Sequence, residues 1–158
     1  MLVEHSVVIN RPTEEVFDVA TCLRRCVVWR SALLSSTKTS DGPVGVGTTF
    51  EQEVHGLGKT YRNTAVITDY EPPHRFAYKR LTGPDDGADY QARFAFEQEG
   101  EGTRYTVWVE GKSPGGWLRV LPTSLLRQWV HNSIAQEMDT LKGMMENGVD
   151  LEAALAAS

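Results

Sequence analysis

Apolar and polar residues alternate along much of this chain, which is the pattern of a β-sheet with one buried face. In the stretch 90–97, every second residue from Tyr90 to Phe96 is apolar, and most of the residues between them are polar or charged. Alternation, β-branched residues and bounding turns predict strands at Val3–Ile9, Thr48–Val54, Lys59–Tyr70, Arg75–Thr82, Tyr90–Glu97 and Thr103–Gly111.

Helical spacing occurs in two places, near the start of the chain and near its end. Pro12 suits the first turn of a short helix, because its missing N–H group would be unpaired there anyway. A second short helix is expected at about Thr21–Trp29. The long helix, Thr123–Asn147, repeats apolar residues on one face, and Asn147-Gly148 is a typical stop. The residues of that face are Leu126, Val130, Ile134, Leu141 and Met145.

Glycine and proline mark the turns between these elements. We expect a loop at 42–47, a hairpin turn at 56–58, a turn at 83–87 and a break at 113–116. No repeat and no linker divides the chain, so residues 1–148 are expected to form one α+β domain, followed by an alanine-rich tail at 149–158.

The chain has 158 residues and a formal net charge of -5, which disfavours nucleic acid as a partner. No stretch approaches about 18 consecutive apolar residues, so no integral membrane association is expected. The first residues lack the basic start and apolar stretch of a signal peptide, and the cytoplasm is therefore the expected location.

Cys22 and Cys26 are the only cysteines, and we expect them to fill space as small hydrophobic residues rather than to form a disulfide. The four histidines show no metal-ligand spacing with Cys, Asp or Glu, so no metal site is expected. No dinucleotide fingerprint, phosphate-binding loop or nucleophile elbow occurs, and no cofactor is expected either.

Several landmarks together give the chain a family resemblance: Val7–Phe17, Trp29, Gly45–Thr48, Asp69–Phe76 and Gly102–Arg104. With this order of elements, the chain resembles the SRPBCC superfamily, which is also called START-like or birch-pollen-allergen-like. Within it, the chain is most similar to the bacterial polyketide cyclase/dehydrase and lipid-transport branch.

This resemblance implies the helix-grip fold, in which a seven-stranded antiparallel sheet curls around a long C-terminal helix. Two short helices separate the first and second strands, and an apolar tunnel lies between sheet and long helix. In aromatase/cyclase members, the tunnel orients a reactive polyketide for ring closure, and the long central strand carries additional tryptophans and an arginine. Here the corresponding stretch, Thr60–Val66, contains no tryptophan, which counts against a cyclase activity.

If the strand phases are right, several side chains point inward toward such a tunnel. Apolar walls with a few polar groups are the usual design of a small-molecule site, although the same rings could simply fill the core. The candidate lining residues are Trp29, Tyr61, Asn63, Phe76, Tyr78, Arg80, Tyr90, Phe94 and Glu137.

Arg80 is the most informative of these residues, because an inward-facing arginine needs an anion nearby. The anion is either a ligand group or Glu137, which lies on the apolar face of the long helix. An unpaired, buried Glu137 would instead be suited to general acid–base chemistry. Trp29 either gates the mouth of the tunnel or closes the core. Trp108 is expected to point outward, where it could contact another subunit.

Three functions are compatible with these features. The first is the binding of a small hydrophobic ligand (aromatic, polyketide-like or lipid) in an internal cavity. The second is a cyclase or dehydratase in which Arg80, Glu137 and Tyr61 or Tyr78 direct proton transfers. The third is a protein-interaction module of the chaperone-activator type, in which Trp108 and the edge strands would matter more than the tunnel. A homodimer is one expected assembly, and Trp117 and Trp129 are expected to be packing residues.

Overall fold

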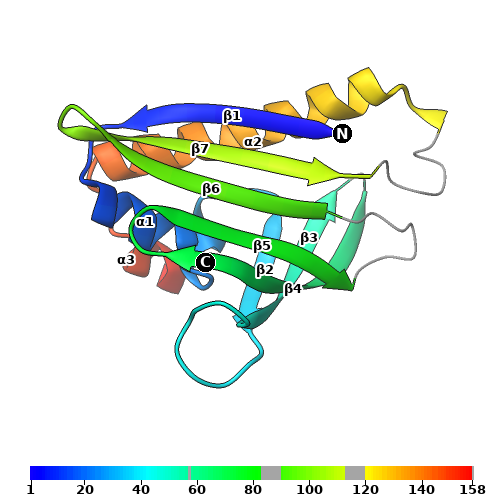
Figure 1. Cartoon of the computed structure of the whole chain (residues 1–158), viewed down its shortest axis with the longest axis horizontal. Helices are drawn as coiled ribbons and strands as arrows, with labels where there is room; N and C mark the ends of the chain where they lie inside the picture. The colour runs from blue at the N-terminus through cyan, green and yellow to red at the C-terminus, as the bar shows by residue number, and fades with distance from the viewer. Residues whose placement is uncertain (57, 83–89, 113–119, 158) are drawn as a thin grey trace.

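The computed structural model describes residues 1–56, 58–82, 90–112 and 120–157. Within these residues, seven strands form one antiparallel sheet, accompanied by three α-helices and a short 3₁₀ helix, η1 (Figure 1). The elements are β1 Leu2–Ile9, α1 Thr13–Thr21, η1 Arg25–Val28, β2 Leu33–Lys38, β3 Thr49–Gly56, β4 Lys59–Glu71, β5 Arg75–Thr82, β6 Tyr90–Glu99, β7 Gly102–Gly111, α2 Thr123–Glu146 and α3 Leu151–Ala157.

The strand order is β1-β7-β6-β5-β4-β3-β2, so every strand after β1 pairs with its neighbour in the sequence, and β1 closes onto β7. The long helix α2 runs along the inner face of the sheet and packs against β1 (Figure 1). Irregular pairing interrupts the β4–β5 ladder at two places, and such interruptions increase the local bend of a sheet. The predicted α+β helix-grip fold is confirmed.

The core lies between the inner face of the sheet and the helices α1 and α2. Phe96 of β6 and Tyr105 of β7 stack with ring centroids 4.9 Å apart, and Phe17 of α1 meets Phe96 edge-on at 5.1 Å. Met138 and Leu141 of α2 are fully buried in the same cluster. The alternation along 90–97 therefore predicted the inner face of β6 correctly, because a strand places every second side chain on the same side.

The predicted second helix is shorter than expected and has a different form. Residues Arg25–Val28 form a single turn of 3₁₀ helix, and Cys22 adopts an extended backbone where α1 ends. The two cysteines therefore do not share a helix face. Both are free thiols, with Cys26 buried and Cys22 half-buried.

Strand β2 had no counterpart among the strands predicted from the alternation, although the family resemblance required a seventh strand. It forms an edge of the sheet and contains Leu33-Leu34-Ser35-Ser36-Thr37-Lys38, which lacks a regular alternation. Its register with β3 shifts between Leu33 and Ser35. Edge strands are often polar and irregular, which blocks unwanted pairing and also weakens their sequence signal. The turn and break predicted at 83–87 and 113–116 lie outside the described residues.

The alanine-rich tail contains helix α3, which packs near η1. Asp150 caps it, because its carboxylate accepts hydrogen bonds from the backbone N–H groups of Glu152 and Ala153 at 3.1 Å. Leu151 is buried, and Arg24 forms a 2.7 Å ion pair with Glu152. This surface pair adds little stability on its own, so the burial of Leu151 is the main attachment of the tail.

The start of β7 holds the corner between β1 and α1. The hydroxyl of the fully buried Thr103 donates to the carbonyl of Arg11 at 2.8 Å, while its neighbour Gly102 lies against the last residue of β1. A Cβ atom on Gly102 would lie 2.7 Å from the carbonyl oxygen of Ile9, which is closer than real Cβ contacts allow. This corner therefore requires glycine at position 102.

We predict that Gly102→Ala lowers the free energy of unfolding by about 1–3 kcal/mol, because backbone rather than a flexible side chain must move. Gly143→Ala is the matched control, since Gly143 lies within α2 with open space around it. That change should raise stability by about 0.5–1 kcal/mol through helix propensity. Urea unfolding followed by circular dichroism measures both. Equal stabilities for Gly102→Ala and the unchanged protein would contradict the close approach.

Candidate ligand-binding cavity

A cavity of about 400 Å³ lies between the inner face of the sheet and helix α2. Most of its lining is apolar, and its size falls in the range of about 300–1,000 Å³ typical of small-molecule sites. All nine residues selected from the sequence contribute to its wall: Trp29, Tyr61, Asn63, Phe76, Tyr78, Arg80, Tyr90, Phe94 and Glu137. Whether they contact a ligand stays a prediction.

An aromatic wall forms one side of the cavity. Tyr78 of β5 stacks on Phe94 of β6 with centroids 5.7 Å apart and meets Phe50 of β3 edge-on at 5.3 Å. Phe76 continues this group, with its ring 5.4 Å from Phe94. Phe76 and Tyr78 are almost completely buried, so they fill the core and also face the cavity. The two alternatives considered for these rings are therefore compatible.

Glu137 forms an ion pair with Arg30, not with Arg80. The Arg30 side chain donates from Nε to Oε2 of Glu137 at 3.1 Å, across 107 positions of sequence. Arg80 is half-buried and also lines the cavity. Of the two partners left open for Arg80, Glu137 is therefore taken by a different arginine, and a ligand group stays a prediction. Because Glu137 is paired, the condition for its use as an unpaired acid or base is not met.

Arg30 lies just after η1, where the chain turns toward β2. Burial opposes its charge, but the proximity of Tyr78 and of the Glu137 carboxylate outweighs this and raises the pKa of Arg30 well above its ordinary value. Arginine is in any case a cation at all physiological pH values. Its side chain is 24% exposed and that of Glu137 is 13% exposed, and both residues line the cavity. The pair is therefore part of the cavity wall and not of the outer surface.

Two tyrosine hydroxyls add to the polar part of the wall. The hydroxyls of Tyr78 and Tyr90 lie 3.0 Å apart, and either of them could be the donor. Burial and the nearby Tyr78 raise the pKa of Tyr90 well above its ordinary value, and burial also raises the pKa of Tyr105. Tyr90 and Tyr105 therefore remain protonated at neutral pH and can act as neutral hydrogen-bonding groups.

Two buried polar atoms of the cavity wall lack a hydrogen-bond partner among the described residues. They are the indole Nε1 of Trp29, which is a donor, and the amide Oδ1 of Asn63, which is an acceptor. Leaving such an atom unpaired costs about 1–3 kcal/mol, so each needs an explanation. Trp29 is only 5% exposed and belongs to the core cluster, which favours its role in closing the core over that of a gate.

The N-terminal half of α2 presents exposed apolar residues beside the cavity. Trp129 is 50% exposed and lines the cavity, and a Cβ atom on Gly56 would be 3.9 Å from its ring. Leu125, one turn earlier, is also exposed. The expectation that Trp129 is an ordinary packing residue is therefore wrong. Trp117 lies outside the described residues.

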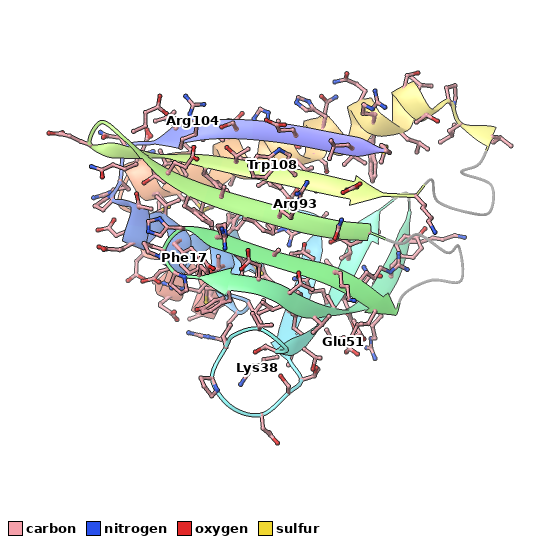
Figure 2. The ribbon with its side chains drawn as sticks, in the orientation of Figure 1. Phe17, Lys38, Glu51, Arg93, Arg104 and Trp108 are labelled. Atoms are coloured by element: carbon pink, nitrogen blue, oxygen red, sulfur yellow. The ribbon has the colours of Figure 1, made fainter. Side chains whose placement is uncertain are left out.

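Trp108 points away from the cavity, as its position in the alternation of β7 predicted. The Arg93 guanidinium on the neighbouring strand lies 5.9 Å from the centroid of its ring. Figure 2 shows the two side chains close together on the face of the sheet that is turned away from α2. Trp108 is half-buried in this arrangement. Its role in contacting another protein or a second copy stays a prediction.

Residues 2–146 match the protein family described as polyketide cyclase/dehydrase and lipid transport. This chain belongs to that family. The resemblance based on the sequence landmarks is thereby confirmed. Among curated proteins, no significant match to this member of the polyketide cyclase/dehydrase and lipid-transport family is found.

Solved structures share the fold of this family member at low sequence identity. A crystal structure of TTHA0849 from Thermus thermophilus has a TM-score of 0.77 at 20% identity, and the match covers 100% of this chain and 99% of that one. A START superfamily protein from Mycobacterium smegmatis gives 0.74 at 14% identity, with 92% and 97% covered. The Zhui aromatase/cyclase from Streptomyces sp. R1128 gives 0.68 at 17% identity, with 99% and 92% covered. At these identities the likeness concerns the fold alone.

None of the helices described here is both long and apolar enough to cross a membrane. Within the same part of the chain, no three His, Cys, Asp or Glu side chains lie together as metal ligands would.

The two cysteines face the cavity in different electrostatic environments. Burial raises the pKa of the Cys22 thiol, but contact with the Arg25 guanidinium outweighs this and brings the pKa below its ordinary value. Burial raises the pKa of Cys26, which is almost fully enclosed. Since the thiolate is the reactive form, Cys22 should be the more reactive of the two.

We predict that iodoacetamide at pH 7.5 modifies Cys22 on the order of tenfold faster than Cys26, because Cys22 combines exposure with more thiolate. Peptide mass mapping at several times measures the two rates. Urea-unfolded protein is the control, since both thiols should then react at similar rates. Faster labelling of Cys26 in the folded protein would contradict the assigned environments.

Proposed function

We propose that this protein binds a small, mainly hydrophobic molecule in the cavity between its sheet and α2. The observation that carries the proposal is a mostly apolar pocket of about 400 Å³ between the sheet and the long helix, partly open to solvent. Globular interiors are close-packed, and voids larger than a water molecule are few. An apolar pocket of this size that reaches into the core is the usual form of a small-molecule site.

The character of the wall favours a ligand with a flat or elongated apolar body. Tyr78 stacks on Phe94 and Phe50 meets Tyr78 edge-on, so aromatic rings form a continuous part of this wall. Aromatic rings gain about 0.5–1.5 kcal/mol from such geometries beyond the burial of area. An aromatic ligand or a folded acyl chain fits this wall, and the family includes proteins described by lipid transport as well as by polyketide cyclisation.

A cyclase or dehydratase is the second candidate, and the polar groups of the wall are what favour it. Arg30, Glu137 and the Tyr78–Tyr90 pair place charged and neutral hydrogen-bonding groups beside the same space. Binding requires only that these groups match the ligand, whereas proton transfer also requires a group that can give up or accept a proton near neutral pH. Glu137 is held by Arg30, so binding is the function that we place first.

We predict that N-phenyl-1-naphthylamine, a neutral dye that fluoresces in apolar surroundings, binds in this cavity. Ser133→Trp should weaken the binding at least about tenfold, because Ser133 of α2 lines the cavity and an indole there occupies part of it. Ser124→Trp is the matched control, since Ser124 is exposed on the same helix and does not line the cavity. Fluorescence titration measures the dissociation constants.

Circular dichroism should show that both variants keep the fold of the unchanged protein. Equal dye binding by the unchanged protein and a folded Ser133→Trp variant would mean that the dye binds elsewhere. No dye binding by the unchanged protein, together with no small molecule detected by mass spectrometry in protein purified from its source, would contradict the proposed function.

A further inference from the structure

The Arg30–Glu137 ion pair places two opposite charges side by side in the cavity wall. Arg30 reaches Glu137 through Nε alone, so its two terminal nitrogens make no hydrogen bond to a described residue. Neither nitrogen is a fully buried atom without a partner, so both are accessible from the cavity or from solvent. The same holds for Oε1 of Glu137. The pair therefore keeps both donors and an acceptor for another molecule.

The charges of this pair cancel, and this decides what kind of polar group fits directly beside it, although the cations Arg80 and Lys112 also line the cavity. A carboxylate could accept two hydrogen bonds from the terminal nitrogens of Arg30. It would then lie close to the Glu137 carboxylate in a poorly solvated space, where like charges repel strongly and lost hydration is not replaced. An uncharged group avoids this repulsion and loses much less hydration on entry.

The hydrogen-bonding groups around the pair require a ligand that both donates and accepts. Oε1 of Glu137 can only accept, and the terminal nitrogens of Arg30 can only donate. In the Tyr78–Tyr90 pair, one hydroxyl donates to the other, which leaves one hydroxyl hydrogen for a further acceptor. A hydroxyl or amide N–H next to a carbonyl would meet all three demands, whereas a carboxylate offers no donor to Glu137.

We propose that the part of the ligand beside the Arg30–Glu137 pair is uncharged and carries a hydrogen-bond donor beside an acceptor, and that Glu137 excludes carboxylates from this position. Glu137 is then the residue that determines charge specificity, and Arg30 supplies the donors for the acceptor. This inference rests on the proposed function, because it assigns a chemical class to the ligand of the same cavity.

The test uses 1-naphthamide and 1-naphthoate, which have nearly the same shape and differ in charge. Each competes with N-phenyl-1-naphthylamine for the unchanged protein at pH 7.5, and the amide should bind at least about tenfold more tightly. This comparison needs no variant and therefore does not depend on whether a substitution folds. Equal binding of the two, or tighter binding of the naphthoate, would overturn the inference.

Glu137→Gln removes the negative charge at nearly constant volume and should raise the affinity for naphthoate at least about tenfold, because Arg30 then lacks an anion. Glu146→Gln is the matched control on the same helix, since Glu146 pairs with Lys142 and does not line the cavity. It should leave both affinities unchanged. The double variant Arg30→Gln/Glu137→Gln should lose the gained naphthoate binding.

The outcomes separate this inference from the function on which it rests. If the dye binds and Glu137→Gln, folded by circular dichroism, shows no gain for naphthoate, the charge specificity is wrong and the binding function stands. If the unchanged protein binds neither the dye nor either naphthalene compound, the proposed function and the inference fail together.

Discussion

The rest of the structure depends on how α2 is held against the sheet. Its buried residues Met138, Leu141 and Met145 lie in the C-terminal half, where Arg11 also donates from Nε to the carbonyl of Met145 at 3.0 Å. In the N-terminal half only Leu126 is buried. The helix is thus anchored at one end by packing, while its other end spans the cavity instead of filling it. The long helix therefore creates both the core and the space beside it.

This uneven anchoring connects the fold to the proposed site. Glu137 precedes the first buried methionine of the anchored half, so a residue whose backbone is well supported carries the charge of the cavity wall. Arg30 approaches from a short segment that η1 and the buried Trp29 hold in place. Ion pairs enclosed in this way gain strength from low local dielectric only when both partners are positioned beforehand. Here the packing of the core provides that positioning.

Much of the fold could be predicted from the sequence, because alternation and helical spacing report directly which side chains are buried. The inner face of β6 and the extent of α2 are examples. Strand β2 could not be predicted from its own residues, since an edge strand with a polar sequence and a shifted register has no clear periodicity. Most of the cavity residues followed from strand phase and Glu137 from helical spacing, but Arg30 followed from neither. It lies between regular elements, where no periodicity gives the direction of a side chain, and its partner is 107 positions away.

The unpaired atoms of Trp29 and Asn63 extend the argument about what fills the cavity. Among the described residues, this donor and this acceptor lack partners, and an apolar space lies beside them. Both features raise the free energy of the folded state. A molecule that removes such costs binds the folded state and not the unfolded one, and so it stabilises the protein by mass action. The unpaired polar atoms and the apolar cavity thus destabilise the core and favour a bound molecule with an apolar body and a neutral, hydrogen-bonding end.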